Sequence, residues 1–91
     1  MKLLILGGGQ LARMLALNAA PLGIECRIVD QQAEGCAAQV APFSRRDWLA
    51  PGALDDLLAW ADVVTYESES IPVPLLESIA SQVPLYPPVR A

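Results

Sequence analysis

Three consecutive glycines, Gly7 to Gly9, and the residues just after them are the part of this chain best suited to bind a ligand. Gly7, Gly9 and Ala12 fit the spacing G-x-G-x-x-G/A, in which glycines allow a tight turn and a close approach of the backbone to a phosphate. A helix that begins directly after such a turn offers unpaired N–H groups to an anion. The pattern therefore predicts a ligand-binding turn, and the alternative is a strand-to-helix turn that binds nothing.

Two acidic residues could complete such a site. Asp30 stands about twenty residues beyond the glycines, where an acid in a nicotinamide-dependent dehydrogenase binds the adenosine ribose. The alternative for Asp30 is that its carboxylate caps the loop that follows. Glu67 comes directly after the β-branched and aromatic run 63–66 and is the first residue of a polar stretch. Ligand crevices in open α/β sheets lie at the carboxyl ends of the strands, so we expect Glu67 beside the glycine turn, with a plain polar loop as the alternative.

The composition argues against several other kinds of site. The chain has no histidine, and its only cysteines are Cys26 and Cys36, which excludes a Cys–His zinc site and a Cys–His nucleophile. The net charge of −4 leaves no basic stripe for nucleic acid or an anionic membrane. Arg45 and Arg46 are expected to form a solvated surface and not a phosphate clamp. The N-terminal apolar run is too short to span a membrane or to act as a signal peptide, so we expect a cytoplasmic protein.

The elements around the glycines are expected to be a strand and a helix. The run 3–6 is apolar without alternation, as in a strand that is buried on both faces of a parallel sheet. In the segment after the glycines, Leu11, Met14 and Leu15 fall on one helical face, and alanines add little bulk elsewhere. This helix is therefore expected to pack flat against the sheet and to end at Pro21 and Gly23.

Strand and helix signals alternate through the rest of the chain. Further strands are expected over 24–30 and 63–66, and short edge strands over 42–46 and 84–86, with helices over 54–61 and 75–80. Right-handed crossovers close such an alternation into a Rossmann-like, doubly wound α/β fold. We predict a mostly parallel sheet of four or five strands in the order 3-2-1-4. Residues 1–91 should form a single domain, which is too small for a complete two-substrate enzyme.

The motifs, taken in order, resemble the N-terminal domain of the N5-carboxyaminoimidazole ribonucleotide synthetases, which are ATP-grasp ligases of bacterial purine synthesis. The resemblance covers the whole chain and is carried by GGGQL at 7–11, RM at 13–14, VD at 29–30 and VTYE at 64–67. Ala12 departs from the family pattern, which usually has glycine there. The segment 31–36 also departs, because the family more often carries aspartate and proline in that loop.

The resemblance implies a ligase that activates bicarbonate with ATP and carboxylates the amino group of 5-aminoimidazole ribonucleotide. It implies that ATP and magnesium bind to later domains, and that this chain holds no catalytic residue, no metal and no cofactor. It also implies that this chain forms one wall of the ribonucleotide site, with Gln10, Leu11 and Glu67 as substrate-binding residues. The chain alone is then expected to be an inactive part of a larger enzyme, whose ATP-grasp and C-terminal domains are its partners.

Two other functions remain open from the residues alone. Asp30 keeps a nicotinamide-binding Rossmann fragment in consideration. A structural module without a ligand is the other alternative, because apolar surface meant for absent domains would be exposed and would favour a homo-oligomer.

Overall fold

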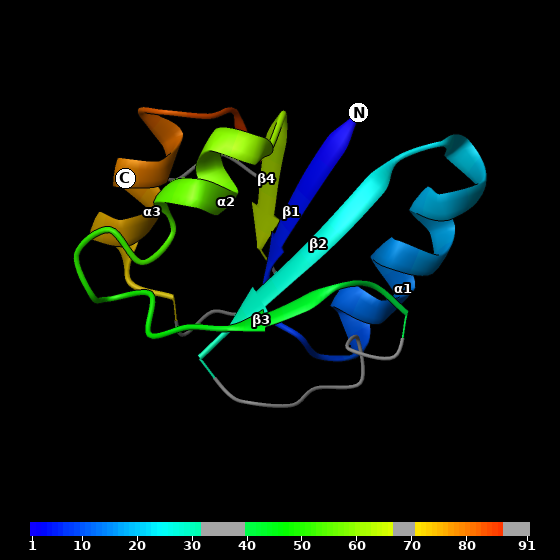
Figure 1. Ribbon diagram of the computed structural model, residues 1–91, viewed down its shortest axis with the longest axis horizontal. Helices are drawn as coiled ribbons and strands as arrows, with labels where there is room; N and C mark the ends of the chain where they lie inside the picture. Colours follow the sequence, from blue (N-terminus) through cyan, green and yellow to red (C-terminus); the bar gives the residue numbers. More distant parts are fainter. Residues whose placement is uncertain (32–39, 67–70, 87–91) are drawn as a thin grey trace.

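The computed structural model describes residues 1–31, 40–66 and 71–86 (Figure 1). Within these residues the chain forms one all-parallel sheet in the strand order β3-β2-β1-β4-β5. The strands are β1 (Lys2–Leu6), β2 (Glu25–Asp30), β3 (Phe43–Arg45), β4 (Val63–Tyr66) and β5 (Leu85–Tyr86). The predicted order 3-2-1-4 is confirmed, and both predicted edge strands are present.

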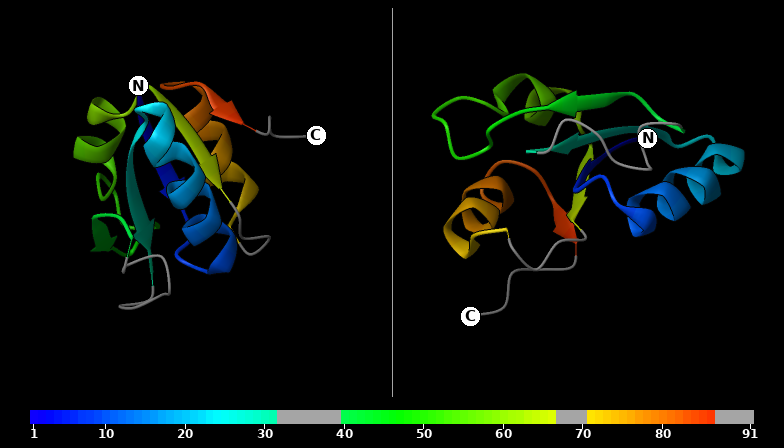
Figure 2. Two further views of the ribbon diagram at one scale, coloured as in Figure 1. Left: turned by 90° about the vertical axis from the view of Figure 1, so that its right-hand side faces the viewer. Right: turned by 90° about the horizontal axis from the view of Figure 1, so that it is seen from below.

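Helices cover both faces of the sheet, as the alternating sequence pattern predicts. They are α1 (Gln10–Ala19), the short 3₁₀ helix η1 (Ala20–Leu22), α2 (Asp55–Trp60) and α3 (Val73–Ala80). Helix α1 lies on one face of the sheet, and α2 and α3 lie on the other, as the views of Figures 1 and 2 show together. The doubly wound α/β fold is therefore confirmed. The segment 31–36, where the sequence departs from the family pattern, lies outside the described ranges except for Gln31.

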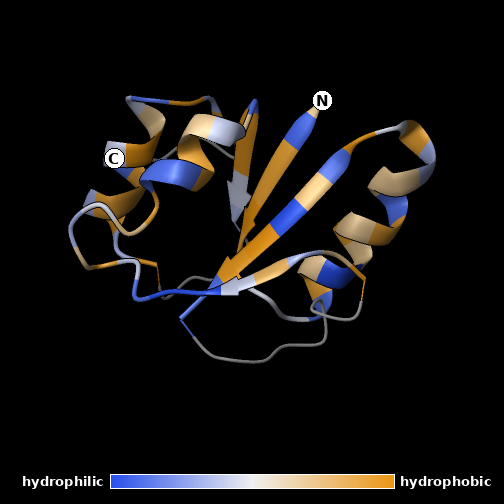
Figure 3. Ribbon diagram, viewed as in Figure 1, coloured by the Kyte–Doolittle hydropathy of each residue, from blue (hydrophilic) through white to orange (hydrophobic). Residues whose placement is uncertain are grey.

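Strand β1 is the centre of the molecule because it is covered on both faces. Leu4 and Leu6 belong to the core beneath α2 and α3, whereas Ile5 belongs to the core beneath α1, and all three side chains have no exposed surface. A strand buried in this way has no position for a polar side chain after its first residue, and Figure 3 shows hydrophobic colour along most of β1. The unbroken apolar run 3–6 thus reflects the position of β1.

The face of α1 that packs against the sheet differs from the face that its large side chains suggest. Ala12, Ala16 and Ala19 are the buried residues of the helix, whereas Leu11 and Met14 each keep 51% of their surface exposed. Methyl groups allow the helix axis to approach β1 and β2 more closely than leucine or methionine side chains would. The expected flat packing is correct, but of the predicted apolar face only Leu15 packs against the core beneath α1, and Leu11 and Met14 lie outside the packing face.

Helix α1 ends where the sequence predicts. Pro21 lies inside η1, and Gly23 takes the left-handed conformation with φ of 76°. Its N–H donates to the carbonyl of Ala20 at 3.1 Å, and the next N–H, of Ile24, donates to the carbonyl of Ala19 at 3.2 Å. This C-terminal cap satisfies carbonyls at the end of the helix and turns the chain into β2.

Candidate functional site

The glycine turn connects the carboxyl end of β1 to the first turn of α1. Gly7 has φ of 108°, a conformation that favours glycine, and its N–H donates to the carbonyl of Val29 at 2.8 Å. Gly9 is the N-cap of α1, and its carbonyl accepts the first helical hydrogen bond, from the N–H of Arg13 at 3.1 Å. The turn is thus tied to β2 before it enters the helix. It lies at the edge of the sheet where α/β proteins place their ligands.

The side chain of Asp30, the last residue of β2, forms a hydrogen bond with this turn. Its Oδ2 atom accepts a hydrogen bond from the N–H of Gly8 at 2.8 Å in a partly buried setting. This contact gives the carboxylate a part in holding the glycine turn, which neither of the two sequence interpretations included. A cap on the following loop would involve residues 32–39, which lie outside the described ranges.

Gly8 is enclosed by a side chain from a third strand. A Cβ atom on Gly8 would lie 2.5 Å from Cε2 and 3.3 Å from Cζ of Phe43, the first residue of β3. The same Cβ would lie 3.5 Å from Oδ2 of Asp30. The middle glycine is therefore needed for space, although the spacing motif, which Gly7, Gly9 and Ala12 fit, allows any residue at position 8. Sequence reasoning missed Phe43, and no local signal marks an aromatic residue of an edge strand as a neighbour of this turn.

The structure places two of the three predicted substrate-binding residues next to the glycine turn. Gln10 is the first residue of α1 and is exposed, and Leu11 follows it with 51% of its surface exposed. Glu67 lies outside the described residues, so its predicted position beside the turn is untested. Tyr66, which precedes it, is in register with Leu6 at the ends of the neighbouring strands β4 and β1.

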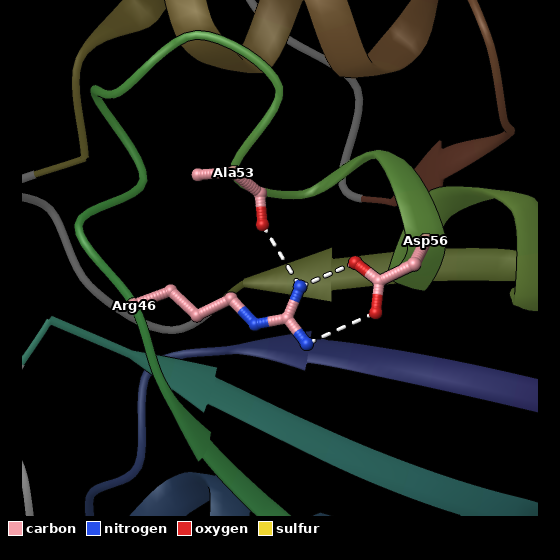
Figure 4. Close-up of polar contacts among 3 residues, drawn as sticks. All are labelled: Arg46, Ala53 and Asp56. Atoms are coloured by element: carbon pink, nitrogen blue, oxygen red, sulfur yellow. Dashed lines mark hydrogen bonds and ion pairs between the residues drawn. The ribbon is translucent and has the colours of Figure 1, made fainter.

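The two arginines after β3 make contacts within the protein. The Nε of Arg45 donates to the carbonyl of Gln31 at 3.1 Å. Arg46 donates through Nη1 to the carbonyl of Ala53 at 2.9 Å and binds both carboxylate oxygens of Asp56 through Nη1 and Nη2 (Figure 4). The hydrogen bond from Arg46 lowers the pKa of Asp56 and raises that of Arg46. These contacts agree with the expected surface role and do not resemble a phosphate clamp.

Other groups that often carry chemistry are not assembled for it in the described part of the chain. Cys26 is a free, buried thiol beneath α1, and burial raises its pKa, so the nucleophilic thiolate is disfavoured. Residues 1–31, 40–66 and 71–86 contain no group of three or more acidic, cysteine or histidine side chains placed to hold a metal ion. Among the helices of these same ranges, none has both the length and the apolar character needed to cross a membrane.

Comparison with known proteins decides the family. The whole chain, residues 1–91, matches the family described as the ribonucleotide synthetase preATP-grasp domain. The chain belongs to this family. The N5-carboxyaminoimidazole ribonucleotide synthase of Brucella melitensis biotype 1 is 45% identical over 91 residues, which cover 96% of this chain and 24% of that protein.

Solved structures agree with the family and with the fold. The crystal structure of N5-carboxyaminoimidazole ribonucleotide synthetase from Thermus thermophilus superposes with a TM-score of 0.89 at 44% identity, over 96% of this chain and 24% of that one. The N5-carboxyaminoimidazole synthetase of Staphylococcus aureus complexed with ADP superposes with a TM-score of 0.84 at 29% identity, over 92% of this chain and 23% of that one. The resemblance carried by the motifs is thus confirmed. This chain spans about a quarter of the length of these relatives.

Proposed function

We propose that this chain forms one wall of the ribonucleotide site of an ATP-dependent ligase that carboxylates 5-aminoimidazole ribonucleotide in purine synthesis in the cytoplasm. ATP and magnesium would bind to other domains of the same polypeptide, and residues 1–91 would act as one substrate-binding domain without a cofactor of their own. The observation that carries the proposal is an exposed Gln10 directly after a glycine turn, at the carboxyl end of the central strand, in a chain of the ribonucleotide synthetase preATP-grasp family.

Each of the three proposed contact residues suits a different part of a ribonucleotide. The Gln10 side chain can both donate and accept hydrogen bonds, which suits ribose hydroxyls or ring nitrogens. Leu11 offers a half-exposed apolar surface to the ribose or the imidazole ring. Glu67 would bring a carboxylate to the amino group or to a hydroxyl of the substrate. Together they could orient the amino group without taking part in the transfer itself.

Titration of the 91-residue chain with 5-aminoimidazole ribonucleotide, followed by NMR, tests the proposal directly. We expect amide shifts centred on Gln10, Leu11 and Glu67, with millimolar affinity or weaker, about −4 kcal/mol, because a single wall leaves most of the substrate uncovered. Gln10→Ala should weaken the response, whereas Gln82→Ala, on an exposed glutamine after α3, should leave it unchanged.

The same titration separates the alternatives. A larger response at the glycine turn to NAD⁺ than to the ribonucleotide would favour the nicotinamide-binding fragment. Concentration-dependent line broadening without a response to either ligand would favour a self-associating module. Either result would contradict the proposed function.

The contribution of Glu67 requires a complete enzyme. We expect that, in a chimera in which this chain replaces the matching quarter of the Brucella melitensis synthase, Glu67→Gln costs about 1–3 kcal/mol in kcat/KM for the ribonucleotide, the size of a hydrogen bond to a charged group. The KM for ATP should stay unchanged, and so should all parameters of Glu77→Gln, an exposed acid on α3. Wild-type kinetics in the Glu67→Gln chimera would show that Glu67 does not bind the substrate and is only part of a polar loop.

A further inference from the structure

The carboxylate of Asp30 connects the ends of two neighbouring strands at the proposed site. Strands β1 and β2 pair in register up to Leu6 and Val29. Just beyond this pair, Oδ2 of Asp30 accepts the N–H of Gly8 at 2.8 Å, and Phe43 of β3 fills the space that a side chain at Gly8 would need. The turn after β1 is therefore held by residues from both β2 and β3.

This contact matters because the turn is built from three glycines. A run of glycines has more backbone freedom to lose than any other sequence, so its native shape needs specific contacts. A hydrogen bond to an ionised, partly buried acceptor is among the stronger single contacts available to a backbone N–H. Gly8 is only two residues before Gln10, so the contact acts close to the proposed substrate-binding side chain.

We propose that Asp30 is a positioning residue of the ribonucleotide site. Its carboxylate fixes the glycine turn in the shape that presents Gln10 and the first turn of α1 to the substrate, while Phe43 prevents the turn from folding back onto β3. Asp30 touches the turn and not the substrate in this role. The inference rests on the proposed ribonucleotide-binding function, which it deepens by naming the residue that shapes its binding turn.

The contact itself can be tested in the 91-residue chain without any ligand. Asp30→Asn conserves the size of the side chain and retains an oxygen acceptor but removes the charge, and Asp30→Ala removes the acceptor. We expect the hydrogen-exchange protection of the Gly8 amide to fall about tenfold in Asp30→Asn and further in Asp30→Ala, with an upfield shift of its proton. Glu25→Gln, an exposed acid on the same strand, is the matched control and should leave Gly8 unchanged.

The positioning role is tested in the chimeric enzyme. We expect the KM for the ribonucleotide to rise about tenfold in Asp30→Asn, with the KM for ATP unchanged and kcat within about twofold of wild type, because only the presentation of the binding turn is altered. Glu25→Gln should again match wild type.

Each contrary result has a distinct meaning. An unchanged Gly8 amide in both Asp30 variants would overturn the inference at the level of the contact. A perturbed Gly8 amide with an unchanged KM for the ribonucleotide would overturn the positioning role while the proposed function stands. Failure of the wild-type chain to respond to the ribonucleotide would overturn the proposed function, and the inference with it, before any variant is made.

Discussion

At the scale of single residues, Arg46 connects the end of β3 to the start of α2 through its side chain. Its guanidinium binds the carbonyl of Ala53 at 2.9 Å and both oxygens of the Asp56 carboxylate, the fork geometry that gives the strongest arginine–carboxylate pairs. The segment between β3 and α2, which these contacts of Arg46 span, contributes Trp48 and Leu54 to the core beneath α2 and α3. Because the side chains of Arg46 and Asp56 are 29% and 67% exposed, solvent screens the pair and its net contribution is small.

The pH dependence of stability should reveal this pair. The hydrogen bond from Arg46 lowers the folded-state pKa of Asp56 from 3.8, so its contribution is complete above pH 3.8 and is lost as the pH falls through the lowered value. We expect Asp56→Asn to lower the urea midpoint at pH 7 and to match wild type once the pH is well below 3.8. Midpoints measured by circular dichroism across this range provide the check.

Asp55→Asn is the control for this measurement. Asp55 also lies in the first turn of α2, so its loss removes the same favourable interaction with the helix dipole, and no ion pair of Asp55 occurs among the residues that the structure describes. We expect its midpoint at pH 7 to stay closer to wild type than that of Asp56→Asn. Equal midpoints for the two variants would show that the ion pair contributes nothing.

At the scale of elements, α1 shows that side-chain size does not decide which face of a helix is buried. The helix packs through Ala12, Ala16 and Ala19, with Leu15 partly buried against the same core, whereas Leu11, Met14 and Leu17 are about half exposed. A close helix–sheet approach leaves no room for additional methylene groups on the alanine face.

Two substitutions distinguish the buried face of α1 from its exposed face. We expect Ala16→Leu to lower the free energy of unfolding by about 1–3 kcal/mol through overpacking, although leucine is a good helix former. Leu17→Ala, on a side chain with 47% of its surface exposed, should change the free energy by no more than about 0.5 kcal/mol. Urea unfolding of both variants measures the difference. A larger loss for Leu17→Ala than for Ala16→Leu would place the buried face on the leucines.

The same element marks the boundary of what could be predicted from the sequence. The alternation of strand and helix signals predicts the order of β3, β2, β1 and β4, because right-handed crossovers leave few other arrangements. Hydropathy alone did not identify the buried face of α1, since leucine, methionine and alanine together occupy most of the helix. The contacts of Gly8 with Asp30 and Phe43 were missed because they depend on how three strands align, which local patterns do not report.

At the scale of the whole molecule, we expect this chain to have no ligase activity by itself. It lacks histidine and any G-x-x-x-x-G-K-[ST] motif, and it spans about a quarter of the length of its relatives. Purified chain incubated with ATP, magnesium, bicarbonate and 5-aminoimidazole ribonucleotide should release phosphate at the background rate.

The chimeric enzyme, assayed in parallel, provides the positive control for this experiment. Turnover by the 91-residue chain that persists at constant specific activity through further purification would contradict the expectation, and it would require a catalytic group within residues 1–91.

The central position of β1 also has a consequence for synthesis on the ribosome. One edge of β1 pairs with β2, which follows within the first thirty residues. The other edge pairs with β4, so the partner of Leu3 on that edge, Val63, is synthesised sixty residues later. Every strand pair in the described residues is parallel, and parallel pairing closes long loops before any contact is gained. During translation, one edge of the apolar strand β1 therefore stays unpaired until β4 has been synthesised. An unpaired apolar strand edge favours binding by a chaperone or by another nascent chain.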